Sequence, residues 1–377
     1  MSGDRTLVVT NDFPPRQGGI QTFVAALLAT RPPESLVVLA SDHPGSAAHD
    51  AALPYPVVRA PTGMLLPTPG VARTAARLVR EHGCRTAFFG AAAPLGLLAP
   101  ALRRAGVERL VGATHGHETG WVALPAARQL LQRIAGGLDA VTYISEYTHG
   151  RLAPALGART ELAQLSPGVD VGRFTPDADG APIRERYGLG DDPVVVCVSR
   201  LVPRKGQDLL VEGWGQVLAR HPRAKLLLVG GGPLERTLRR AVSDRGLTGS
   251  VVLTGGVGPA DLPAHYAAGD VFAMPCRTRR GGLDVEGLGM VFLEAAACGR
   301  PVVAGTSGGA PETVRDGVTG HVVDPRSPAA VAGVLADLLD DPAHARAMGA
   351  AGRAWVEQRW SWTTIASTFA GLLDPAR

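Results

Sequence analysis

Short apolar runs recur along the first half of the chain, and longer amphipathic stretches lie between some of them. Apolar runs of this length predict buried strands, whereas the stretch Gly70–His82 has the spacing of a helix. Strands that alternate with helices favour a parallel sheet with helices on both faces. The expected strands of this half are Leu7–Thr10, Ser35–Ala40, Val57–Arg59, Thr86–Phe89, Arg109–Ala113 and Val141–Ile144.

The segment Phe174–Pro193, rich in Pro, Gly and Asp, interrupts this pattern, and we expect a linker there. The chain has 377 residues, more than the roughly 250–300 at which a single core stops growing. We therefore expect an α/β protein with two doubly wound, Rossmann-like domains, the first over residues 1–176 and the second from residue 177. The expected strands of the second are Val194–Ser199, Lys225–Val229, Val251–Thr254, Val271–Ala273 and Pro301–Ala304.

Charge is distributed unevenly along the chain. Residues 1–176 hold 16 Arg and 12 acidic residues, whereas the remainder holds 22 basic and 22 acidic residues, so the net charge of +4 arises in the first half. Such an excess is compatible with an anionic membrane, an anionic substrate or nucleic acid, and also with an ordinary solvated surface. Its small size favours the ordinary surface, and we expect no nucleic-acid partner.

The four cysteines, Cys84, Cys197, Cys276 and Cys298, lie far apart without a CxxC pair. This spacing predicts neither a zinc site nor a disulfide framework, and free thiols are typical of a reducing cytosol. The N-terminal sequence MSGDRTLVV lacks an apolar run of signal length, and no stretch of about 18 apolar residues is long enough to span a membrane. We therefore expect a cytoplasmic location.

Basic residues gather in SRLVPRKGQD, directly after a predicted strand. Arg200, Arg204 and Lys205 fall within six residues, and Arg and Lys both bind phosphate oxygens. The alternative is an ordinary charged loop between a strand and a helix. A glycine-rich turn, GGGPLE, follows the next predicted strand and is by itself a weak phosphate-binding signal.

Two glutamates, Glu286 and Glu294, are separated by seven residues in DVEGLGMVFLEAAACGRPVV. Glu286 falls in a Gly-rich loop, and Met290–Ala297 has the pattern of a helix that begins there. The free N–H groups at a helix start attract an anion, and a departing diphosphate needs such a site. The alternative is a loop glutamate followed by one on a helix face. The N–H groups expected to face the anion are those of Gly289, Met290 and Val291.

The first half offers two further candidate segments. Gly18 and Gly19 precede an expected helix and would allow close approach by a phosphate or a sugar. His115 and His117 lie with Glu118 after a predicted strand. Their spacing is poor for a metal because no third ligand is evident, so we expect no metal site. We favour a hydrogen bond to a sugar hydroxyl, and we expect at least one of the two histidines to be an ordinary loop residue.

The helix Gly70–His82 places Arg73, Arg77 and Arg80 on one face. Apolar residues 64–66 precede it. A basic face beside apolar residues can dock on anionic lipid, although a solvated arginine face is the commoner meaning of this pattern.

Taken together, these motifs resemble glycosyltransferase family 4. SRLVPRKGQD is similar to its donor-phosphate loop, GGGP to its glycine turn, and E-x7-E with CGRPVV to its signature, while TSGGAPETVRDGVTGHVV is similar to the segment that follows. The resemblance implies the GT-B fold, in which two Rossmann-like domains face across a cleft. It implies an acceptor domain over 1–176, a nucleotide-sugar domain over 177–358 and a C-terminal helix over 359–377 that packs back on the first domain.

Within this family the chain resembles the subgroup of phosphatidylinositol monomannoside mannosyltransferases. VTNDFPPRQGGIQTF, FGAAAPLG, THGHE, YISEYT, MPCRTRRGGLDVEGLGMVFLEA and WSW carry this likeness. The resemblance implies GDP-mannose as donor and a phosphatidylinositol mannoside as acceptor. It also implies an α-1,6 product, made by an enzyme bound peripherally to the anionic inner face of the plasma membrane, while it leaves the oligomeric state open.

The resemblance also implies roles for individual residues. Arg200 and Lys205 would bind the donor diphosphate near Gly19, and Glu286 would bind the hexose hydroxyls. Glu294 would bind the ribose, and Val257 would contact the base through its backbone, although Thr254 and Gly256 depart from the more charged turn expected there. The implied catalytic set is His115, Arg200, Lys205 and Glu286, and the candidates for contact with the acceptor or sugar are Gln21 and His117.

The implied reaction retains the anomeric configuration without a metal or other cofactor, because Arg200 and Lys205 take the place of a cation at the diphosphate. Three alternatives remain open at this point. The chain could be a family 4 enzyme with another nucleotide sugar or a soluble acceptor, a nucleotide-sugar epimerase of the same fold, or a non-catalytic binding protein. The E-x7-E signature argues against the epimerase, and the four intact donor-site residues argue against the binding protein.

Overall fold

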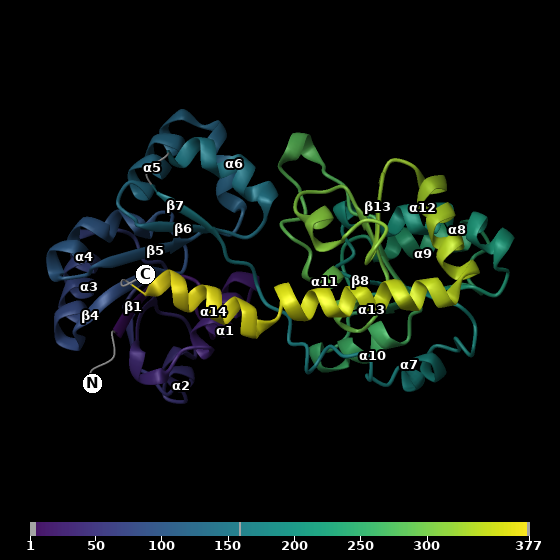
Figure 1. Ribbon diagram of the computed structural model, residues 1–377, viewed down its shortest axis with the longest axis horizontal. Helices are drawn as coiled ribbons and strands as arrows, with labels where there is room; N and C mark the ends of the chain where they lie inside the picture. Colours follow the sequence, from purple (N-terminus) through teal and green to yellow (C-terminus); the bar gives the residue numbers. More distant parts are fainter. Residues whose placement is uncertain (1–4, 158–159, 375–377) are drawn as a thin grey trace. The chain divides into compact units, whose positions relative to one another are not determined.

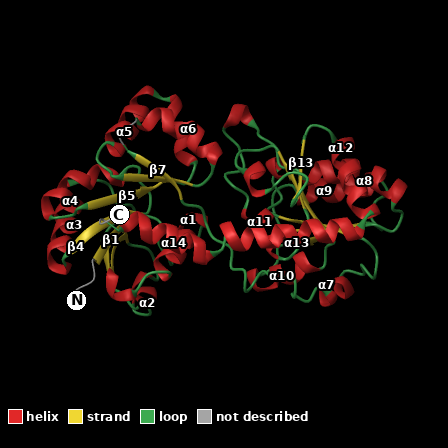
Figure 2. Cartoon of the chain, viewed as in Figure 1, coloured by secondary structure: helices red, strands yellow, loops and turns green. Residues whose placement is uncertain are grey.

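The computed structural model describes residues 5–157 and 160–374. The chain divides into two compact units (Figure 1). The first comprises the described residues up to Pro167 together with those from Thr363 onward, and the second runs from Gly168 to Trp362. Figure 2 shows strands in the interior of each unit with helices packed around them.

The first unit is built on a parallel sheet of strand order β3-β2-β1-β4-β5-β6-β7. Successive connections run outward in both directions from β1 and β4, and right-handed crossovers then place helices on both faces of the sheet. The sequence predicted six of these strands but not β7. The strands are β1 (Arg5–Thr10), β2 (Leu36–Ser41), β3 (Val57–Ala60), β4 (Cys84–Phe89), β5 (Arg109–Ala113), β6 (Ala140–Tyr143) and β7 (Glu161–Gln164).

The helices of the first unit include α3, which coincides closely with the predicted Gly70–His82. Its buried residues are Ala75, Leu78 and Val79, and its arginines lie on the opposite, solvent-facing side. The α-helices are α1 (Gly19–Ala29), α2 (Ser46–Asp50), α3 (Pro69–His82), α4 (Ala99–Ala105), α5 (Pro125–Ala135), α6 (Glu146–Leu156) and α14 (Trp362–Leu373). Short 3-10 helices are η1 (Pro33–Ser35), η2 (Leu95–Leu98) and η3 (His117–Ala123).

The C-terminal helix α14 packs on the first unit. The ring of Phe369 meets that of Phe88 edge-on, with centroids 5.0 Å apart, and both rings are fully buried. The carbonyl groups at the end of α14 are bonded too, since Thr86 Oγ1 donates to Leu373 O at 3.0 Å and Arg109 Nε to Leu372 O at 2.9 Å. Aromatic burial and satisfied carbonyls together anchor the helix.

The second unit repeats the plan with a parallel sheet of order β10-β9-β8-β11-β12-β13. The sequence predicted five of its strands but not β13. The strands are β8 (Val194–Val198), β9 (Lys225–Val229), β10 (Val251–Gly255), β11 (Val271–Met274), β12 (Val302–Gly305) and β13 (Gly320–Val323). The α-helices are α7 (Ala181–Arg186), α8 (Gln207–Arg220), α9 (Glu235–Asp244), α10 (Leu262–Ala267), α11 (Met290–Ala297), α12 (Pro328–Asp340) and α13 (Pro342–Arg359), and the 3-10 helices are η4 (Pro203–Lys205), η5 (Pro259–Asp261), η6 (Arg280–Gly282) and η7 (Ala310–Thr313).

The segment Phe174–Pro193 is not a linker. It contains α7, and the ring of Phe174 is buried against Tyr266 with centroids 5.9 Å apart. Just before it, Val169 N donates to Trp360 O at 2.7 Å, which ties the segment to the end of α13. The division between the units therefore falls after Pro167 and not after residue 176, because these residues bury their apolar side chains in the second unit.

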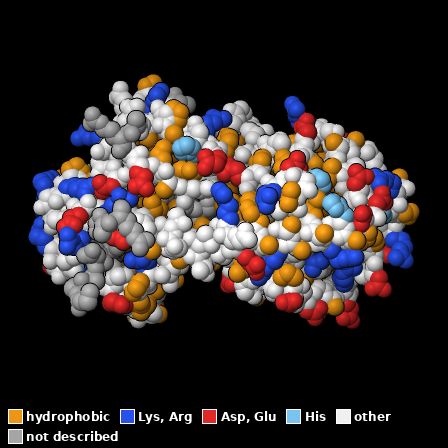
Figure 3. Space-filling model, in the orientation of Figure 1, with side chains coloured by type: hydrophobic (Ala, Val, Ile, Leu, Met, Phe, Trp, Pro, Cys, Tyr) orange, Lys and Arg blue, Asp and Glu red, His pale blue; other side chains and the backbone are white. Residues whose placement is uncertain are grey.

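These observations confirm the predicted α/β class with two doubly wound, parallel sheets. The four cysteines are buried free thiols. Across the described ranges we find no helix that combines the length and apolar character needed to cross a bilayer. In Figure 3, basic and acidic side chains are interspersed over the visible surface of each unit.

Candidate functional site

Each sheet has one point at which its strand order reverses, between β1 and β4 in the first unit and between β8 and β11 in the second. Ligands of doubly wound sheets bind beyond the carboxyl ends of the strands at such a point. In the second unit, the loops that leave this point are Ser199–Gly206 after β8 and Pro275–Gly289 after β11. They contain four of the donor-site residues predicted from the sequence, Arg200, Lys205, Glu286 and Gly289.

The two loops are joined by a buried ion pair. Lys205 Nζ lies 2.7 Å from Glu286 Oε2, and the two side chains are only 10% and 9% exposed. Further hydrogen bonds hold the backbone of Glu286, because its N–H donates to Ser307 Oγ at 3.1 Å and its carbonyl accepts from Gly309 N at 3.0 Å. Each charge of this pair is largely removed from water and therefore depends on the other.

Arg204 adds a second cation to Glu286. Its Nε lies 3.6 Å from Glu286 Oε2, and its Nη1 lies 3.5 Å from Asp284 Oδ1. The sequence placed Arg204 in a basic loop but did not reveal that it bridges two acids of the other loop. The site thus holds two cations and two carboxylates in close contact, and it can bind an anion and hydroxyl groups side by side.

Two glycines allow the strand-end loops of this unit to approach one another, Gly206 in the loop after β8 and Gly308 in the loop after β12. Gly206 has φ +81°, and a Cβ there would lie 2.2 Å from Pro275 O. Gly308 has φ +55°, and a Cβ there would lie 1.9 Å from Glu286 O. Both contacts are with backbone atoms that cannot move aside easily, so a side chain at either position would push the loops apart.

The start of α11 lies beside the same carboxylate. Gly289 is the N-cap residue, and no side chain accepts a hydrogen bond from the first turn. Met290 and Val291 are half-buried. The N–H groups at a helix start and the helix dipole together attract negative charge. The predicted anion-binding residues therefore occupy a real helix N-terminus, within reach of Glu286, whose Cγ would lie 3.5 Å from a Cβ at Gly289.

Glu294 lies on the first turns of α11 and is held by Tyr266 of α10. The Tyr266 hydroxyl donates to Glu294 Oε2 at 2.6 Å. Burial raises the pKa of Glu294 above its usual value, although the bond from Tyr266 opposes this shift in part. Burial likewise raises the pKa of Tyr266 well above its usual range. The sequence pointed to Glu294 through the signature spacing, but no local pattern pointed to Tyr266.

Arg200 differs from Lys205 because it is exposed and, among the described residues, forms no ion pair. Its backbone is well anchored: the carbonyl of Arg200 accepts from Gln207 Nε2 at 3.1 Å, and the next residue, Leu201, donates its N–H to Gly231 O in the glycine turn at 2.9 Å. The guanidinium is therefore free to bind an incoming anion. Val257, the candidate for base contact, is half-buried and packs against the core of this unit.

In the first unit, the loop after β1 leads to Gly18 and Gly19 at the start of α1. Gln21 of α1 is buried, and its Nε2 donates to Asp12 Oδ1 at 2.7 Å. A Cβ at Gly18 would lie 2.2 Å from Gln21 Oε1, whereas a Cβ at Gly19 would meet no atom within 4 Å. Gly18 thus makes room for Gln21, and Gly19 lies on the open side of the loop. Because Gln21 is buried and bonded to Asp12, it positions the loop.

His115 lies just beyond β5 and reaches the loop after β4. Its Nε2 donates to Gly90 O at 2.6 Å, because a carbonyl oxygen can only accept. In the neutral ring the lone pair is then on Nδ1. Burial lowers the pKa of His115, so the ring is neutral around pH 7. Its main-chain N–H donates to Glu118 Oε2 at 3.1 Å, and its ring meets that of Phe23 edge-on, with centroids 6.0 Å apart.

His117 has a different environment. Its side chain is 51% exposed, and its Nε2 lies 3.4 Å from Glu118 Oε1. Its ring lies parallel to that of His115, with centroids 6.3 Å apart. Over residues 5–157 and 160–374, no group of three or more His, Cys, Asp and Glu side chains could hold a metal ion. The buried Glu118 bonds the backbone of residues 115 and 116.

Comparison with known proteins bears on this geometry. The family described as glycosyltransferase family 4 matches residues 17–173, and the family described as glycosyl transferases group 1 matches residues 181–355. A Mycolicibacterium smegmatis protein named GDP-mannose-dependent α-(1-6)-phosphatidylinositol monomannoside mannosyltransferase is 54% identical over 98% of each chain. A Corynebacterium glutamicum protein, named as the corresponding monoacylated phosphatidylinositol monomannoside mannosyltransferase, is 49% identical over 99% of each chain.

The chain belongs to glycosyltransferase family 4. It is therefore an enzyme, a glycosyltransferase, and its two doubly wound units are those of the GT-B fold. Solved structures share this fold. Anabaena HepE in complex with UDP aligns with a TM-score of 0.80 at 22% identity over 98% of this chain and 99% of that one. Sucrose-phosphate synthase from Thermosynechococcus elongatus aligns with a TM-score of 0.72 at 22% identity over 98% of each chain.

Within each unit, the family 4 fold brings together residues that are far apart in the sequence. In the second unit it joins Lys205 to Glu286 and places the start of α11 beside them. In the first unit it sets His115 against the carbonyl of Gly90. The contributions of Gly90, Tyr266 and Ser307 could not be seen in the sequence, because each acts through a contact made only by folding.

Proposed function

We propose that this family 4 enzyme transfers mannose from GDP-mannose to phosphatidylinositol monomannoside and forms an α-1,6 linkage with retained configuration. The observation that carries the proposal is the extent of the similarity, 54% identity over 98% of both chains, to a protein named for this reaction. The buried pair of Lys205 and Glu286 supports it, because it provides a cation for a diphosphate and a carboxylate for sugar hydroxyls in one place.

The donor diphosphate would be bound by three sources of positive charge. Arg200 is exposed and has no ion pair among the described residues, Lys205 follows in the same loop, and the start of α11 carries N–H groups without a capping side chain. Negative charge grows on the diphosphate as the bond to the sugar breaks, so these groups bind the transition state more tightly than the ground state. On this basis we propose that the enzyme needs no metal ion.

The carboxylates would bind the rest of the donor. Glu286 accepts hydrogen bonds, and we propose that it orients the mannose hydroxyls beside the diphosphate. Glu294, held by the Tyr266 hydroxyl at 2.6 Å, would accept the ribose hydroxyls. Val257 would face the base through its backbone. We assign the base itself from the named relatives, because a backbone contact does not by itself select guanine.

In the proposed reaction the bond between the anomeric carbon and the diphosphate oxygen breaks, and the acceptor hydroxyl bonds to the same face of the sugar. The acceptor proton passes to the departing phosphate oxygen, so no protein nucleophile is required. We assign His115 to a donor-sugar hydroxyl, which its Nδ1 lone pair can accept as a hydrogen bond. The open side of Gly19 would admit the diphosphate.

We further propose that the enzyme binds the anionic inner face of the plasma membrane through α3 and the segment before it. Met64 and Leu66 are 60% and 49% exposed, and Arg73 and Arg80 of α3 are exposed without an ion pair among the described residues. Apolar side chains beside basic ones suit the interface of an anionic bilayer.

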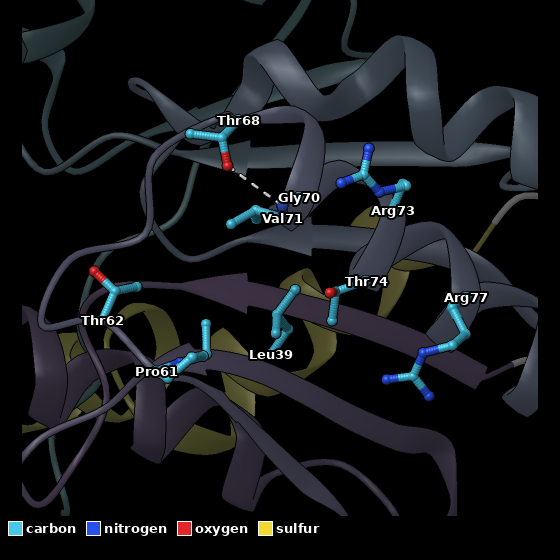
Figure 4. A pocket seen from close by; sticks show the side chains of 10 residues that line it. Leu39, Pro61, Thr62, Thr68, Gly70, Val71, Arg73, Thr74 and Arg77 are labelled. Atoms are coloured by element: carbon cyan, nitrogen blue, oxygen red, sulfur yellow. Dashed lines mark hydrogen bonds between the residues drawn. The ribbon is translucent and has the colours of Figure 1, made fainter.

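A cavity of about 510 Å³ beside α3 adds to this surface (Figure 4). The side chains of Arg73 and Arg77 extend from the helix on one side, and Pro61 and Thr62 lie on the other. At the start of the helix Thr68 Oγ1 accepts from Val71 N at 3.4 Å. The cavity combines threonine hydroxyls with arginine, which suits a lipid headgroup.

The test of the proposed function is GDP release from GDP-mannose, measured with and without phosphatidylinositol monomannoside in liposomes, beside UDP-glucose as an alternative donor. We expect GDP release that depends on the acceptor, a mannosylated lipid product and no loss of activity in EDTA. Turnover with UDP-glucose alone would keep the reaction class and overturn the donor, and equal turnover with a soluble mannoside would overturn the lipid acceptor.

The membrane proposal has its own measurement. Liposomes that contain phosphatidylinositol should sediment the wild-type protein, whereas Met64→Ser/Leu66→Ser and Arg73→Ser/Arg80→Ser should remain largely in solution. The control is Val318→Ser, which removes another exposed apolar side chain, 45% exposed, from the second unit. Equal sedimentation of all four proteins would contradict a membrane contact through α3.

A further inference from the structure

A short hairpin stands in the loop between β11 and α11, just before the donor-site carboxylate Glu286. Its stem is closed by two backbone hydrogen bonds, since Arg279 N donates to Asp284 O at 2.9 Å and Asp284 N to Arg279 O at 3.2 Å. The four residues 280–283 form its tip, with η6 inside it. Paired backbone groups at the stem give the tip a defined shape.

The tip is strained. Arg280 has φ +51°, and among the described residues it is the one non-glycine residue with positive φ. Gly281 and Gly282 follow with φ +62° and +95°. A long side chain in the left-handed region costs about 1–2 kcal/mol, and such strain persists only where the surroundings hold it and is concentrated at functional sites. A glycine at position 280 would relieve the strain, so the presence of an arginine there points to a role for its guanidinium.

The tip also exposes an apolar side chain, which is ordinarily buried, and a basic side chain, which can form an ion pair. Leu283 is 78% exposed, the highest value among the exposed large hydrophobic residues of the described chain. The side chain of Arg280 is exposed and forms no ion pair or hydrogen bond within the described ranges, although the backbone carbonyl of Arg280 accepts from Leu283 N at 3.3 Å. The arginine of the stem behaves differently, because Arg279 Nη1 lies 3.9 Å from Asp284 Oδ2. The tip therefore presents a free cation and a bare apolar group together.

The hairpin is linked to the donor site. Asp284 Oδ1 lies 3.5 Å from Arg204 Nη1, and the same guanidinium lies 3.6 Å from Glu286. Asp284 is also only two residues before Glu286 in the chain. The strained tip is thus fixed to the carboxylate assigned to the transferred sugar, and a group bound at the tip would be held near the reacting centre.

We propose that Arg280 and Leu283 form part of the acceptor site, where the Arg280 guanidinium binds the phosphodiester of the acceptor headgroup and Leu283 packs against the apolar part of the same molecule. This inference rests on the proposed function, because it takes the acceptor to be an anionic glycolipid. A guanidinium binds two phosphate oxygens at once, and a phospholipid headgroup offers an anion beside apolar carbon. The hairpin then makes the donor domain a determinant of acceptor specificity.

The experiment measures initial rates with two acceptors, phosphatidylinositol monomannoside in mixed micelles and methyl α-mannoside, which has neither phosphate nor acyl chain. The variants are Arg280→Asn, which tolerates positive φ and removes the charge, Arg280→Lys, which keeps the charge, and Leu283→Ser. The control is Arg240→Ala, an exposed arginine on α9 whose Nε lies 3.5 Å from Asp244. GDP affinity is measured alongside by calorimetry.

We expect Arg280→Asn to raise the KM for the lipid acceptor by about tenfold and leave kcat and GDP affinity unchanged. The charge-preserving Arg280→Lys should recover most of this loss, and Leu283→Ser should raise the same KM by about threefold. None of the variants should change the rate with methyl α-mannoside. An unchanged lipid KM in Arg280→Asn, or an equal loss with both acceptors, would overturn the proposal.

The outcome separates this inference from the proposed function. If the wild-type enzyme uses GDP-mannose and the lipid while Arg280→Asn behaves as wild type, only the role of the hairpin fails. If the wild-type enzyme shows no lipid turnover at all, the proposed function fails first, and the hairpin proposal is overturned with it.

Discussion

The switch-point loops of the two units hold their functional groups by different means. In the second unit, Lys205 and Glu286 form a buried ion pair that Arg204 supports. In the first unit, the candidate side chains are neutral and make hydrogen bonds, since the Gln21 amide donates to Asp12 and the His115 ring donates to the carbonyl of Gly90. We propose that the first arrangement stabilises charge on a leaving group, whereas the second shapes a surface that a ligand can approach closely. On this proposal, the same fold serves charge stabilisation in one unit and positioning in the other.

The anchoring of these loops shows the same contrast. Arg59 of β3 anchors the loop after β1, because its Nη2 donates to Pro14 O at 2.6 Å. The side chain is 11% exposed, and it also donates to both oxygens of Asp50 and to Ser41 O at 2.8 Å. The Arg59 guanidinium therefore stabilises the fold of this unit through its bonds to other residues. The loop after β8 instead leaves Arg200 without an ion pair among the described residues. A cation free to bind a ligand thus distinguishes the proposed diphosphate loop.

The largest effect is expected from Lys205→Ala. It removes the closest cation from both Glu286 and the proposed diphosphate, so we expect activity to fall by about 10³-fold and stability by about 2 kcal/mol. Steady-state rates and urea unfolding measure the two losses. The matched control is Lys225→Ala, because Lys225 Nζ donates to Gly249 O at 2.9 Å and lies 3.7 Å from Asp192 Oδ2, away from Glu286. Similar activities of Lys205→Ala and Lys225→Ala would show that the reaction does not depend on the cation at position 205.

The next effect concerns close approach at Gly19. A Cβ there would meet no protein atom within 4 Å, so Gly19→Ala should fold with an unchanged melting temperature and yet lose activity by about 10²-fold through contact with the donor. Differential scanning calorimetry and a donor KM measure this. Gly249→Ala, at another glycine where a Cβ would meet no protein atom within 4 Å, should be neutral in both assays. A Gly19→Ala enzyme with wild-type kinetics would show that the donor does not approach this loop.

The two histidines provide a finer test. His115→Ala should lower kcat by about tenfold, whereas His117→Ala should stay within about twofold because its ring is half exposed. Burial lowers the pKa of His115, so its ring is neutral from about pH 6.5 upward. Between pH 6.5 and 8 the pH profiles of the wild type and of His115→Ala should therefore have the same shape. A fall in the wild-type rate as the pH rises over this range, absent from His115→Ala, would contradict a neutral hydrogen-bonding role for His115.

The smallest effect is a pH-dependent change in stability at Glu294. Because burial raises its pKa above 4.5, the folded state binds this proton more tightly than the unfolded state, and the carboxyl destabilises the fold increasingly as the pH rises through the folded pKa. Glu294→Gln should therefore raise the melting temperature by about 2 °C at pH 8 and by less at pH 5, while donor affinity falls. An equal shift in melting temperature at both pH values would show that the pKa of Glu294 is not raised in the folded state.

Much of the fold could be predicted from the sequence because buried parallel strands are continuous apolar runs, and all eleven runs predicted as strands became strands. Two strands were missed. β7 reads ELAQ and β13 reads GHVV, and each joins the edge of a sheet, where partly exposed residues weaken the apolar signal. The segment Phe174–Pro193 was mistaken for a linker because its Pro, Gly and Asp residues hide the contacts of Phe174 and Ile183 with the core.

The sequence by itself determined the fold class, the family and the identity of the charged residues in the donor loops, because local patterns and motif spacing carry that information. Only the tertiary structure decided which of those residues meet. It paired Lys205 with Glu286, placed the Tyr266 hydroxyl on Glu294 and set His115 Nε2 on Gly90 O. The physical reason is that these contacts join separate strand-end loops, and their distances arise only when the sheet brings the loops to one edge.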